Sequence, residues 1–438
     1  MSKREIAEKI FMAGVAGVLP DKLIAENVFR EGSVLRFGDL TLFSEKIRNL
    51  YVIGAGKASA AMGHYVEAIL GDLVTGGLII TKYGYACTLK RIKVREAGHP
   101  VPDIAGFEAT REIIEICEGA GEDDLVVCLL SGGGSALMSD LPPGLLPEDI
   151  YLINNMLVRC GADITEINTV RKHLSEIKGG QLAKRVWPAS LVSIMISDVS
   201  GNKPDVIASG PTVPDTTTFH DAWKVLEKYH LTGDVTMGIK EMLLSGVEGK
   251  RPETPKPGDS IFDRTSNILA GTNEIALIAA QDAAADSGYN ARIVTDNLTG
   301  DSENAAQMIT ETALSFRDNT ECLKPLCLLY GGETTLKVTG PGLGGRNQHL
   351  ALAAAIKLAN HPGITVLSAG TDGNDGPTDA AGAVVDSSTI QAAKSSGIDP
   401  EIHLREFDSY SFFRKAGGHI ITGPTYTNVM DLVVVLID

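Results

Sequence analysis

Two glycine-rich turns in the chain each end in a cation that opens a predicted helix. The first is Gly54-Ala55-Gly56-Lys57, directly after the apolar run Leu50–Ile53, and the second is Gly344-Gly345-Arg346. A cation at a helix N-terminus is locally unfavourable, because that end carries positive partial charge. Backbone N–H groups, a helix N-terminus and a cation together suit a phosphate or a carboxylate. The two turns therefore indicate phosphoryl chemistry.

Neither turn is a complete nucleotide-binding fingerprint. Ser59 stands where the third glycine of GxGxxG belongs, and the spacing of GxxxxGK[ST] is absent. A tight strand–helix turn with Lys57 in solvent is the alternative interpretation of the first turn.

A second glycine run follows the apolar segment Leu125–Leu130. It reads Ser131-Gly132-Gly133-Gly134-Ser135 and does not match the GxSxG of a hydrolase. Ligands of open α/β sheets bind beyond the carboxyl ends of the strands. We therefore expect the backbone N–H groups of this run to hold a carboxylate or phosphate of the substrate.

Two further residues follow predicted strands. Asp198 ends the run Leu191–Ser197, where a carboxylate can act as a general base or a Mg²⁺ ligand, although an N-cap or turn role is commoner for Asp. His99 lies in the turn Ala97-Gly98-His99-Pro100 and is a candidate substrate contact, against the commoner structural role of a lone histidine.

The second half of the chain carries two more polar loops after predicted strands. One is Gly331-Gly332-Glu333-Thr334, and the other runs from Gly370 through Asp372 and Asp375. The acidic loop lacks the bidentate glutamate of an EF-hand. Contact with Mg²⁺ or a nucleotide is one interpretation of this loop, and a solvated turn is the other.

The alternation of strands and helices predicts an α/β fold. Continuous apolar runs without alternation favour mainly parallel sheets that are covered on both faces. The predicted strands are Leu50–Gly54, Gly77–Thr81, Leu125–Ser131, Leu191–Ser197, Leu326–Tyr330, Ile364–Ala369 and Leu432–Ile437. The predicted helices include Ile6–Val18, Ala58–Leu70, Ile104–Cys117, Pro147–Arg159, Glu274–Ala285, Ser302–Leu314 and Asn347–Leu358.

A proline-rich, charged stretch at 246–263 predicts a linker between two domains. We place a Rossmann-like domain at residues 1–245 and a second α/β domain at residues 264–438. The first helix could instead pack on the second domain, since chain termini often dock far away in sequence.

Composition narrows the function classes. The chain has 438 residues, of which 44% are hydrophobic and 21% charged, and its formal net charge is −16. This acidity argues against nucleic acid and anionic membrane as partners, because both need a basic surface. No apolar run has the length of a membrane span, the N-terminus does not resemble a secretory signal, and the six scattered cysteines form no CxxC pair. We expect a cytoplasmic protein that acts on a small molecule.

These segments together resemble the glycerate 2-kinases of the glycerate kinase/MOFRL family, whose members combine a DUF4147 and a MOFRL domain. The similar segments keep the family's order over nearly the whole chain, although Tyr426 stands where the family has Gly. They are Val52–Ser59, Gly98–Pro102, Leu130–Leu137, Ile196–Val199, Gly331–Thr334, Gly345–Gln348, Gly370–Gly373 and Thr422–Thr425.

The resemblance implies ATP-dependent phosphorylation of D-glycerate at its 2-hydroxyl, with Mg²⁺ or another divalent cation, in a cleft between two α/β domains. It implies Lys57, Asp198 and Arg346 as catalytic residues. The two cations would neutralise phosphoryl charge, and Asp198 would orient or deprotonate the hydroxyl or hold the metal. Substrate-binding candidates are His99, Ser131, Gly132, Gly133, Gly134 and Ser135; nucleotide-binding candidates are Gly331, Gly332, Glu333, Thr334, Gly370 and Asp372; metal candidates are Asp198, Asp372 and Asp375.

Two other functions stay open at this stage, as does a homodimeric assembly. A hydroxypyruvate reductase would explain the dinucleotide-like first turn, but Ser59 breaks the fingerprint and Thr81-Lys82-Tyr83-Gly84 lacks the acidic residue expected there. A non-catalytic sugar-acid binding protein is the second alternative, and the many polar strand-end loops argue against it.

Overall fold

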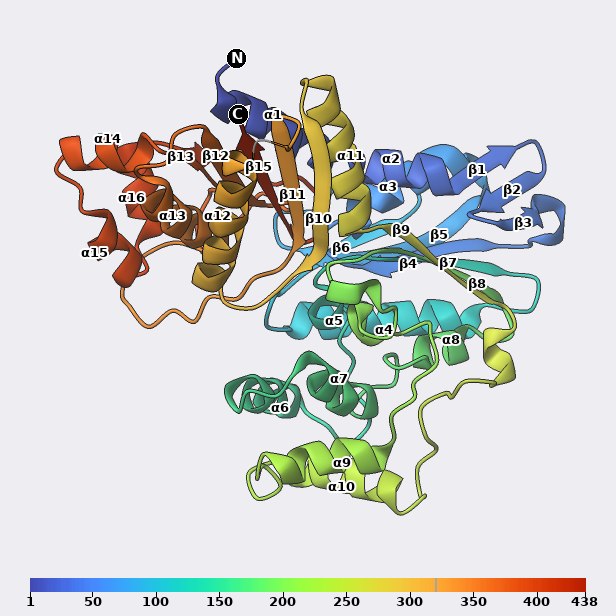
Figure 1. The fold of residues 1–438 in the computed structure, drawn as a ribbon. Helices are drawn as coiled ribbons and strands as arrows, with labels where there is room; N and C mark the ends of the chain where they lie inside the picture. Colours follow the sequence, from blue (N-terminus) through green and yellow to red (C-terminus); the bar gives the residue numbers. More distant parts are fainter. Residues whose placement is uncertain (320) are drawn as a thin grey trace. The chain divides into compact units, whose positions relative to one another are not determined.

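The computed structural model describes residues 1–319 and 321–438. The chain divides into two compact units. The N unit is Pro20–Ala270, and the C unit is Gly271–Asp438 together with Met1–Leu19. Each unit is built on its own six-stranded sheet, in the order β6-β5-β4-β7-β8-β9 for the N unit and β10-β11-β15-β12-β13-β14 for the C unit (Figure 1).

The sheet of the N unit confirms the expected parallel α/β arrangement. Each strand pair from β6 to β8 is parallel. Strands β4 and β7 are buried along almost their whole length, which explains their continuous apolar sequences. The strands are β4 (Leu50–Ala55), β5 (Val74–Lys82), β6 (Lys93–Ala97), β7 (Leu125–Leu130), β8 (Ser190–Ile196) and β9 (Thr265–Gly271).

Helices cover both faces of this sheet, and a further helical layer packs beyond one of them (Figure 1). The outer layer has an apolar core of its own that includes Leu157, Val170, Phe219, Leu226 and Leu243. The helices are α2 (Pro20–Asn27), α3 (Ser59–Leu70), α4 (Ile104–Gly119), α5 (Gly134–Leu137), α6 (Pro147–Arg159), α7 (Ile164–His173), α8 (Gln181–Val186), α9 (Phe219–Lys228) and α10 (Met237–Val247). A separate small sheet consists of β1 (Val28–Glu31), β2 (Val34–Phe37) and β3 (Leu40–Phe43).

The sheet of the C unit is mixed, which corrects the expectation of a mainly parallel sheet. Strand β10 is parallel to β11, whereas β15 lies between β11 and β12 and is antiparallel to both. Both faces of β15 are covered, so its apolar run looks like that of a parallel strand. The strands are β10 (Asn290–Leu298), β11 (Leu326–Gly332), β12 (Ile364–Gly370), β13 (Gly382–Asp386), β14 (His419–Ile420) and β15 (Asp431–Ile437).

The first helix, α1 (Lys3–Gly17), belongs to the C unit, the alternative that the sequence left open. It packs against α11 (Asn273–Asp286), β12 and β15. Its Arg4 forms two hydrogen bonds with Asp386, at 2.7 and 2.9 Å, and Lys3 reaches Asp438. The remaining helices of this unit are α12 (Ser302–Asp318), α13 (Arg346–Leu358), α14 (Thr389–Ser395), α15 (Pro400–Arg405) and α16 (Ser409–Ala416).

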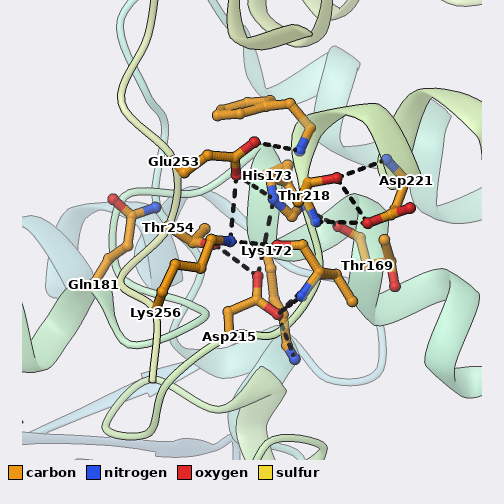
Figure 2. A network of polar contacts seen from close by, with 12 residues as sticks. Thr169, Lys172, His173, Gln181, Asp215, Thr218, Asp221, Glu253, Thr254 and Lys256 are labelled. Carbon is orange, nitrogen blue, oxygen red and sulfur yellow. Dashed lines mark hydrogen bonds and ion pairs between the residues drawn. The ribbon is translucent and has the colours of Figure 1, made fainter. Parts of the chain in front are cut away.

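The proline-rich stretch at 246–263 lies within the N unit, and the division of the chain falls after it, at Ala270. Strand β9, which follows the stretch, is the edge strand of the N-unit sheet beside β8. Polar contacts hold the stretch in place (Figure 2). Glu253 accepts from the backbone N–H of Phe219 at 3.0 Å, and Thr254 donates to Asp215 at 2.9 Å. Its prolines and charges therefore mark an anchored loop of one unit.

The centre of that network is the buried carboxylate of Asp215 (Figure 2). Lys172 Nζ lies 3.3 Å from it, and His173 Nε2 lies 3.9 Å from it and 3.3 Å from Glu253. Burial opposes ionisation of Asp215, but the charge of Lys172 and hydrogen bonds from Thr217 hold its pKa below the usual 3.8. The Lys172–Asp215 pair joins helix α7 to the loop before α9, and Glu253 and Thr254 extend the network to the loop after α10.

Two further features are the state of the cysteines and the length and polarity of the helices. All six cysteines carry free thiols, and burial raises the pKa of Cys117 to about 12. Within residues 1–319 and 321–438, no helix has both the length and the apolar character that crossing a bilayer requires.

Replacing Asp215 with Asn is expected to lower the free energy of unfolding of the N unit by about 3 kcal/mol at pH 7, because Lys172 loses its buried counter-charge and keeps only the partly exposed Asp205, at 3.6 Å. The lowered pKa of Asp215 stabilises the folded state above the unfolded pKa, near 3.9, and that contribution disappears as pH falls through the folded value. The deficit should therefore shrink below about pH 4.

Both tryptophans, Trp187 and Trp223, lie in the N unit, so urea unfolding followed by tryptophan fluorescence measures it. The exposed Asp234→Asn is the matched control and should change the unfolding free energy by less than about 0.5 kcal/mol. Equal stability of the two variants at pH 7 would show that the ion pair does not hold the unit together.

Candidate functional site

The predicted site residues of the N unit follow neighbouring parallel strands. Lys57 follows β4, the run Ser131–Ser135 follows β7, Asp198 follows β8 and His99 follows β6. Because β6, β5, β4, β7 and β8 are parallel neighbours, all four sets lie at the carboxyl edge of the same sheet. The sheet topology therefore brings together the N-unit residues that the sequence selected.

The turn that carries Lys57 is locked against the turn after β7. A Cβ on Gly56 would lie 2.0 Å from Ser131 Oγ, so only glycine allows this approach. Ser131 Oγ accepts from the N–H of Ala58 at 3.0 Å and lies 3.0 Å from Ser59 Oγ. Lys57 donates its own N–H to the carbonyl of Gly132 at 2.9 Å. The buried hydroxyl of Ser131 thus holds the two turns together, and the Ser59 that breaks the dinucleotide fingerprint is part of the same contact.

The glycine run after β7 makes a tight turn against His99. Gly133 has a positive φ of 86°, and a Cβ there would lie 2.7 Å from the imidazole Cδ2 of His99. The N–H of Gly134 donates to the carbonyl of Ser131 at 3.1 Å, so part of the expected anion nest is closed within the turn itself. Ser135, in the short helix α5, is the hydroxyl at the far end of the turn.

Ser135 belongs to a hydrogen-bonded chain that the sequence did not reveal. Its Oγ lies 2.7 Å from Ser209 Oγ, and Ser209 donates to Asn168 Oδ1 at 2.9 Å. Ala208 and Ser209 both have positive φ, at 50° and 60°, a conformation that side chains disfavour. The Ala208-Ser209-Gly210 loop looks like an ordinary polar loop in sequence, and the signal that could have found its role was its position soon after β8.

In the C unit, Arg346 opens helix α13 and faces protein carboxylates. Its Nε and Nη2 donate to Asp431 at 2.6 and 2.9 Å, and its Nη1 lies 2.6 Å from Glu333. Burial lowers the pKa of Arg346, but these carboxylates more than offset it, so the pKa lies above its usual value. Asp431, the first residue of β15, was not among the sequence-predicted residues, because a single Asp before an apolar strand carries no motif.

The N-terminus of α13 is occupied by a protein carboxylate. Asp375, which is 2% exposed, accepts from the N–H groups of Asn347 and Gln348 at 3.1 and 2.8 Å. Gln348 Nε2 donates to the same carboxylate at 3.0 Å. Burial raises the pKa of Asp375 to about 6, against these hydrogen bonds. The anionic group at the N-terminus of α13 is therefore the carboxylate of Asp375.

The nucleotide-binding candidates lie at the ends of β11 and β12. Gly331 packs so closely that a Cβ would lie 1.6 Å from Asn273 Oδ1, and one on Gly332 would lie 2.3 Å from the backbone N of Leu298. A Cβ on Gly370 would lie 3.4 Å from both Asp372 Oδ1 and Asp431 Oδ1. Glu333, Gly370, Asp372 and Arg346 thus gather around Asp431 at one edge of the C-unit sheet, with Thr334 following β11 at the same edge.

The described residues do not form a protein-only metal site. No group of three His, Cys, Asp or Glu side chains in that part of the chain is placed to hold an ion. Asp375 is buried, and both of its oxygens accept hydrogen bonds from α13; its role as a metal ligand stays a prediction. Asp198 and Asp372 are each a single carboxylate at a strand end, which suits Mg²⁺ only when phosphate oxygens complete its shell.

Comparison with known proteins identifies the class of this chain. Residues 6–244 match the model described as a domain of unknown function (DUF4147), and residues 326–431 match the MOFRL family model. The chain belongs to the glycerate kinase family that combines these two domains.

Individual relatives span the whole chain. A D-glycerate 2-kinase from Thermotoga maritima is 40% identical, with 100% of this chain and 99% of the relative covered. A protein from Agrobacterium vitis with a provisional hydroxypyruvate reductase name is 39% identical, with 100% and 95% covered. A solved glycerate kinase structure from Thermotoga maritima matches with a TM-score of 0.87 and 38% identity over 99% of each chain. The α/β fold and the family resemblance predicted from the sequence are confirmed.

Replacing Asp375 with Ala is expected to destabilise the start of α13 by about 1–2 kcal/mol, because two backbone N–H groups lose their acceptor. Hydrogen exchange followed by mass spectrometry should show faster exchange in the peptide that covers the first two turns of α13. Asp282→Ala, at an exposed position of α11, is the matched control and should leave exchange unchanged. Unchanged protection in Asp375→Ala would contradict the capping role.

Proposed function

We propose that this protein transfers the γ-phosphoryl group of ATP to the 2-hydroxyl of D-glycerate, giving 2-phospho-D-glycerate and ADP. The observation that carries the proposal is the match of the whole chain, both units included, to a D-glycerate 2-kinase. The clusters of charged and glycine-rich turns at the strand ends of each unit support it, because phosphoryl transfer depends on positioning and on neutralising spread negative charge.

Within the N unit, Lys57 would neutralise charge on the transferred phosphoryl group, and Asp198 would orient or deprotonate the attacking hydroxyl. Gly132, Gly133 and Ser135 would contact the acid, and His99, packed on Gly133, would shape that side of the site. Ser131 would contribute through position, since its hydroxyl already joins two turns.

Within the C unit, Arg346 would be the second phosphoryl-binding cation, aimed by Asp431 and Glu333. Gly331, Gly332, Thr334 and Gly370 would present backbone to the nucleotide. ATP would bring Mg²⁺ with it, and Asp198 or Asp372 would add one carboxylate to a shell made mainly of phosphate and water oxygens.

The decisive experiment supplies the full-length protein with D-glycerate, ATP and Mg²⁺ and identifies the product by phosphorus NMR. A 2-phosphoglycerate signal that EDTA abolishes supports the proposal, including the metal. A 3-phosphate product would overturn the regiochemistry. Oxidation of NADH by hydroxypyruvate without ATP consumption would support a reductase instead, which is the function named for the Agrobacterium vitis relative. Tight glycerate binding without either reaction would favour a sugar-acid binding protein.

Lys57→Ala removes a positive charge, and Arg346→Lys removes the paired N–H donors of the guanidinium. Each variant is expected to lower kcat by about 10²- to 10³-fold, because the transition state loses stabilisation. Steady-state kinetics and circular dichroism would measure turnover and folding together. The exposed Lys22→Ala and Arg414→Ala are controls in the N and C units and should keep normal turnover. Normal kcat in either site variant would remove that residue from the mechanism.

We also infer a cytoplasmic enzyme that assembles as a homodimer. The free thiols agree with a reducing compartment, where disulfides are rare. Light scattering coupled to size exclusion should give twice the mass of the 46.3 kDa chain, and a monomer mass would overturn the assembly. Detection of the protein in a membrane or secreted fraction would overturn the location.

A further inference from the structure

The N unit contains a cavity of about 530 Å³ that shares only Ser135 with the residues assigned to the proposed function. Its lining includes Ser135 of the glycine turn and two basic side chains, Arg171 and Lys178. The apolar part of the wall comes from Pro100, Val101, Ile150, Ile153, Val158 and Leu174. A concave, mostly apolar pocket with a few convergent polar groups is the usual form of a small-molecule site.

Arg171 is the unusual group in this cavity. Its Nε donates to Asn154 Oδ1 at 2.6 Å, and within the described part of the chain no carboxylate forms an ion pair with its guanidinium. Burial lowers the pKa of Arg171, and no neighbouring carboxylate offsets that effect. The side chain is partly buried, so the missing counter-charge is unfavourable, and the planar fork of a guanidinium matches a carboxylate through two parallel hydrogen bonds.

The other charged groups at the cavity leave a net positive charge. Lys178 Nζ donates to the carbonyl of Met138 at 2.8 Å, and burial lowers the pKa of Lys178 to about 8, so it is mostly charged at pH 7. Asp140 is the carboxylate in the lining, and it accepts from Ser175 Oγ and the N–H of Glu176, both at 2.5 Å. Two cations and one carboxylate suit a monoanion far better than a nucleotide with several charges.

Ser135 adds a preference for a hydroxyl group. Ser209 donates its only hydroxyl proton to Asn168, so Ser135 donates to Ser209 and presents its free lone pairs as an acceptor. Asn168 and Arg171 lie three residues apart on α7 and therefore on the same face of the helix. The cavity thus offers a carboxylate partner and a hydroxyl acceptor to the same ligand.

We propose that this cavity binds the carboxylate end of a small hydroxy acid, with Arg171 as the residue that selects for the carboxylate and Ser135 as the acceptor for a hydroxyl. The proposal rests on the proposed function in taking D-glycerate as the first ligand. The cavity is larger than glycerate requires and its walls are apolar, so hydroxy acids with an apolar substituent at C3 also fit. Arg171 supplies the charge that the partly closed glycine turn lacks.

The test is calorimetric titration of the full-length protein with D-glycerate in the absence of nucleotide, together with KM measurements. Arg171→Gln should weaken glycerate binding at least 30-fold and raise its KM to match, while the KM for ATP stays within twofold. Arg159→Gln, an exposed arginine at the end of α6, is the matched control and should bind normally. (R)-3-phenyllactate should compete with glycerate, and its neutral methyl ester should not.

A second variant guards against misfolding of Arg171→Gln. Val158 lines the cavity and is 63% exposed, so Val158→Glu adds a negative charge without burying it and should weaken glycerate binding at least fivefold. Ile164→Glu, exposed but outside the lining, is its control. Normal glycerate binding in folded Arg171→Gln and in Val158→Glu overturns the proposal.

The measurements distinguish a wrong cavity assignment from a wrong proposed function. If the protein forms 2-phosphoglycerate while both cavity variants keep the normal KM for glycerate, the kinase stands and the cavity assignment is wrong. If the protein binds glycerate through Arg171 but forms no phosphorylated product, the cavity assignment stands and the proposed function is wrong.

Discussion

The buried ion pair between Lys172 and Asp215 is the contact on which the N unit depends. It ties helix α7 to the loop after β8 and, through Thr254, to the proline-rich stretch that returns the chain to the sheet. Helix α7 also carries Asn168, which contacts Ser209, and Arg171, which lines the cavity. Removal of one partner of a buried ion pair leaves an uncompensated charge, so the two segments are coupled through this contact.

The two turns that carry a cation at a helix N-terminus are held in place by different contacts. At Lys57, a glycine without a Cβ lets two strand-end turns interlock around the hydroxyl of Ser131. At Arg346, protein carboxylates take both roles: Asp375 caps the helix, and Asp431 with Glu333 holds the guanidinium. A phosphate that binds beside Arg346 would compete with an existing ion-pair network, which gives that cation a fixed direction and a high pKa.

Much of the fold followed from local patterns. The seven predicted strands and the predicted helix Pro147–Arg159 coincide with elements of the structure, because long buried apolar runs and amphipathic helices signal themselves within a short window. Strand direction in the C unit did not follow, because β15 arrives from the end of the chain and inserts antiparallel between two earlier strands. The stretch at 246–263 has the composition of a linker, and only its contacts with Asp215 and Phe219 show it to be anchored.

The sequence by itself determined the class of the protein, the residues at the strand ends and the family, because glycine turns after apolar strands are local features that keep their order along the chain. The tertiary structure decided which of those residues are engaged and by what. Asp375 became a helix cap, Ser131 a link between two turns, and Arg171 a partly buried cation at a cavity, and none of these roles could be derived from neighbouring residues in the sequence. The reason is physical: burial, a missing counter-charge and the direction of a hydrogen bond depend on residues that are distant in the chain, and only folding brings them together.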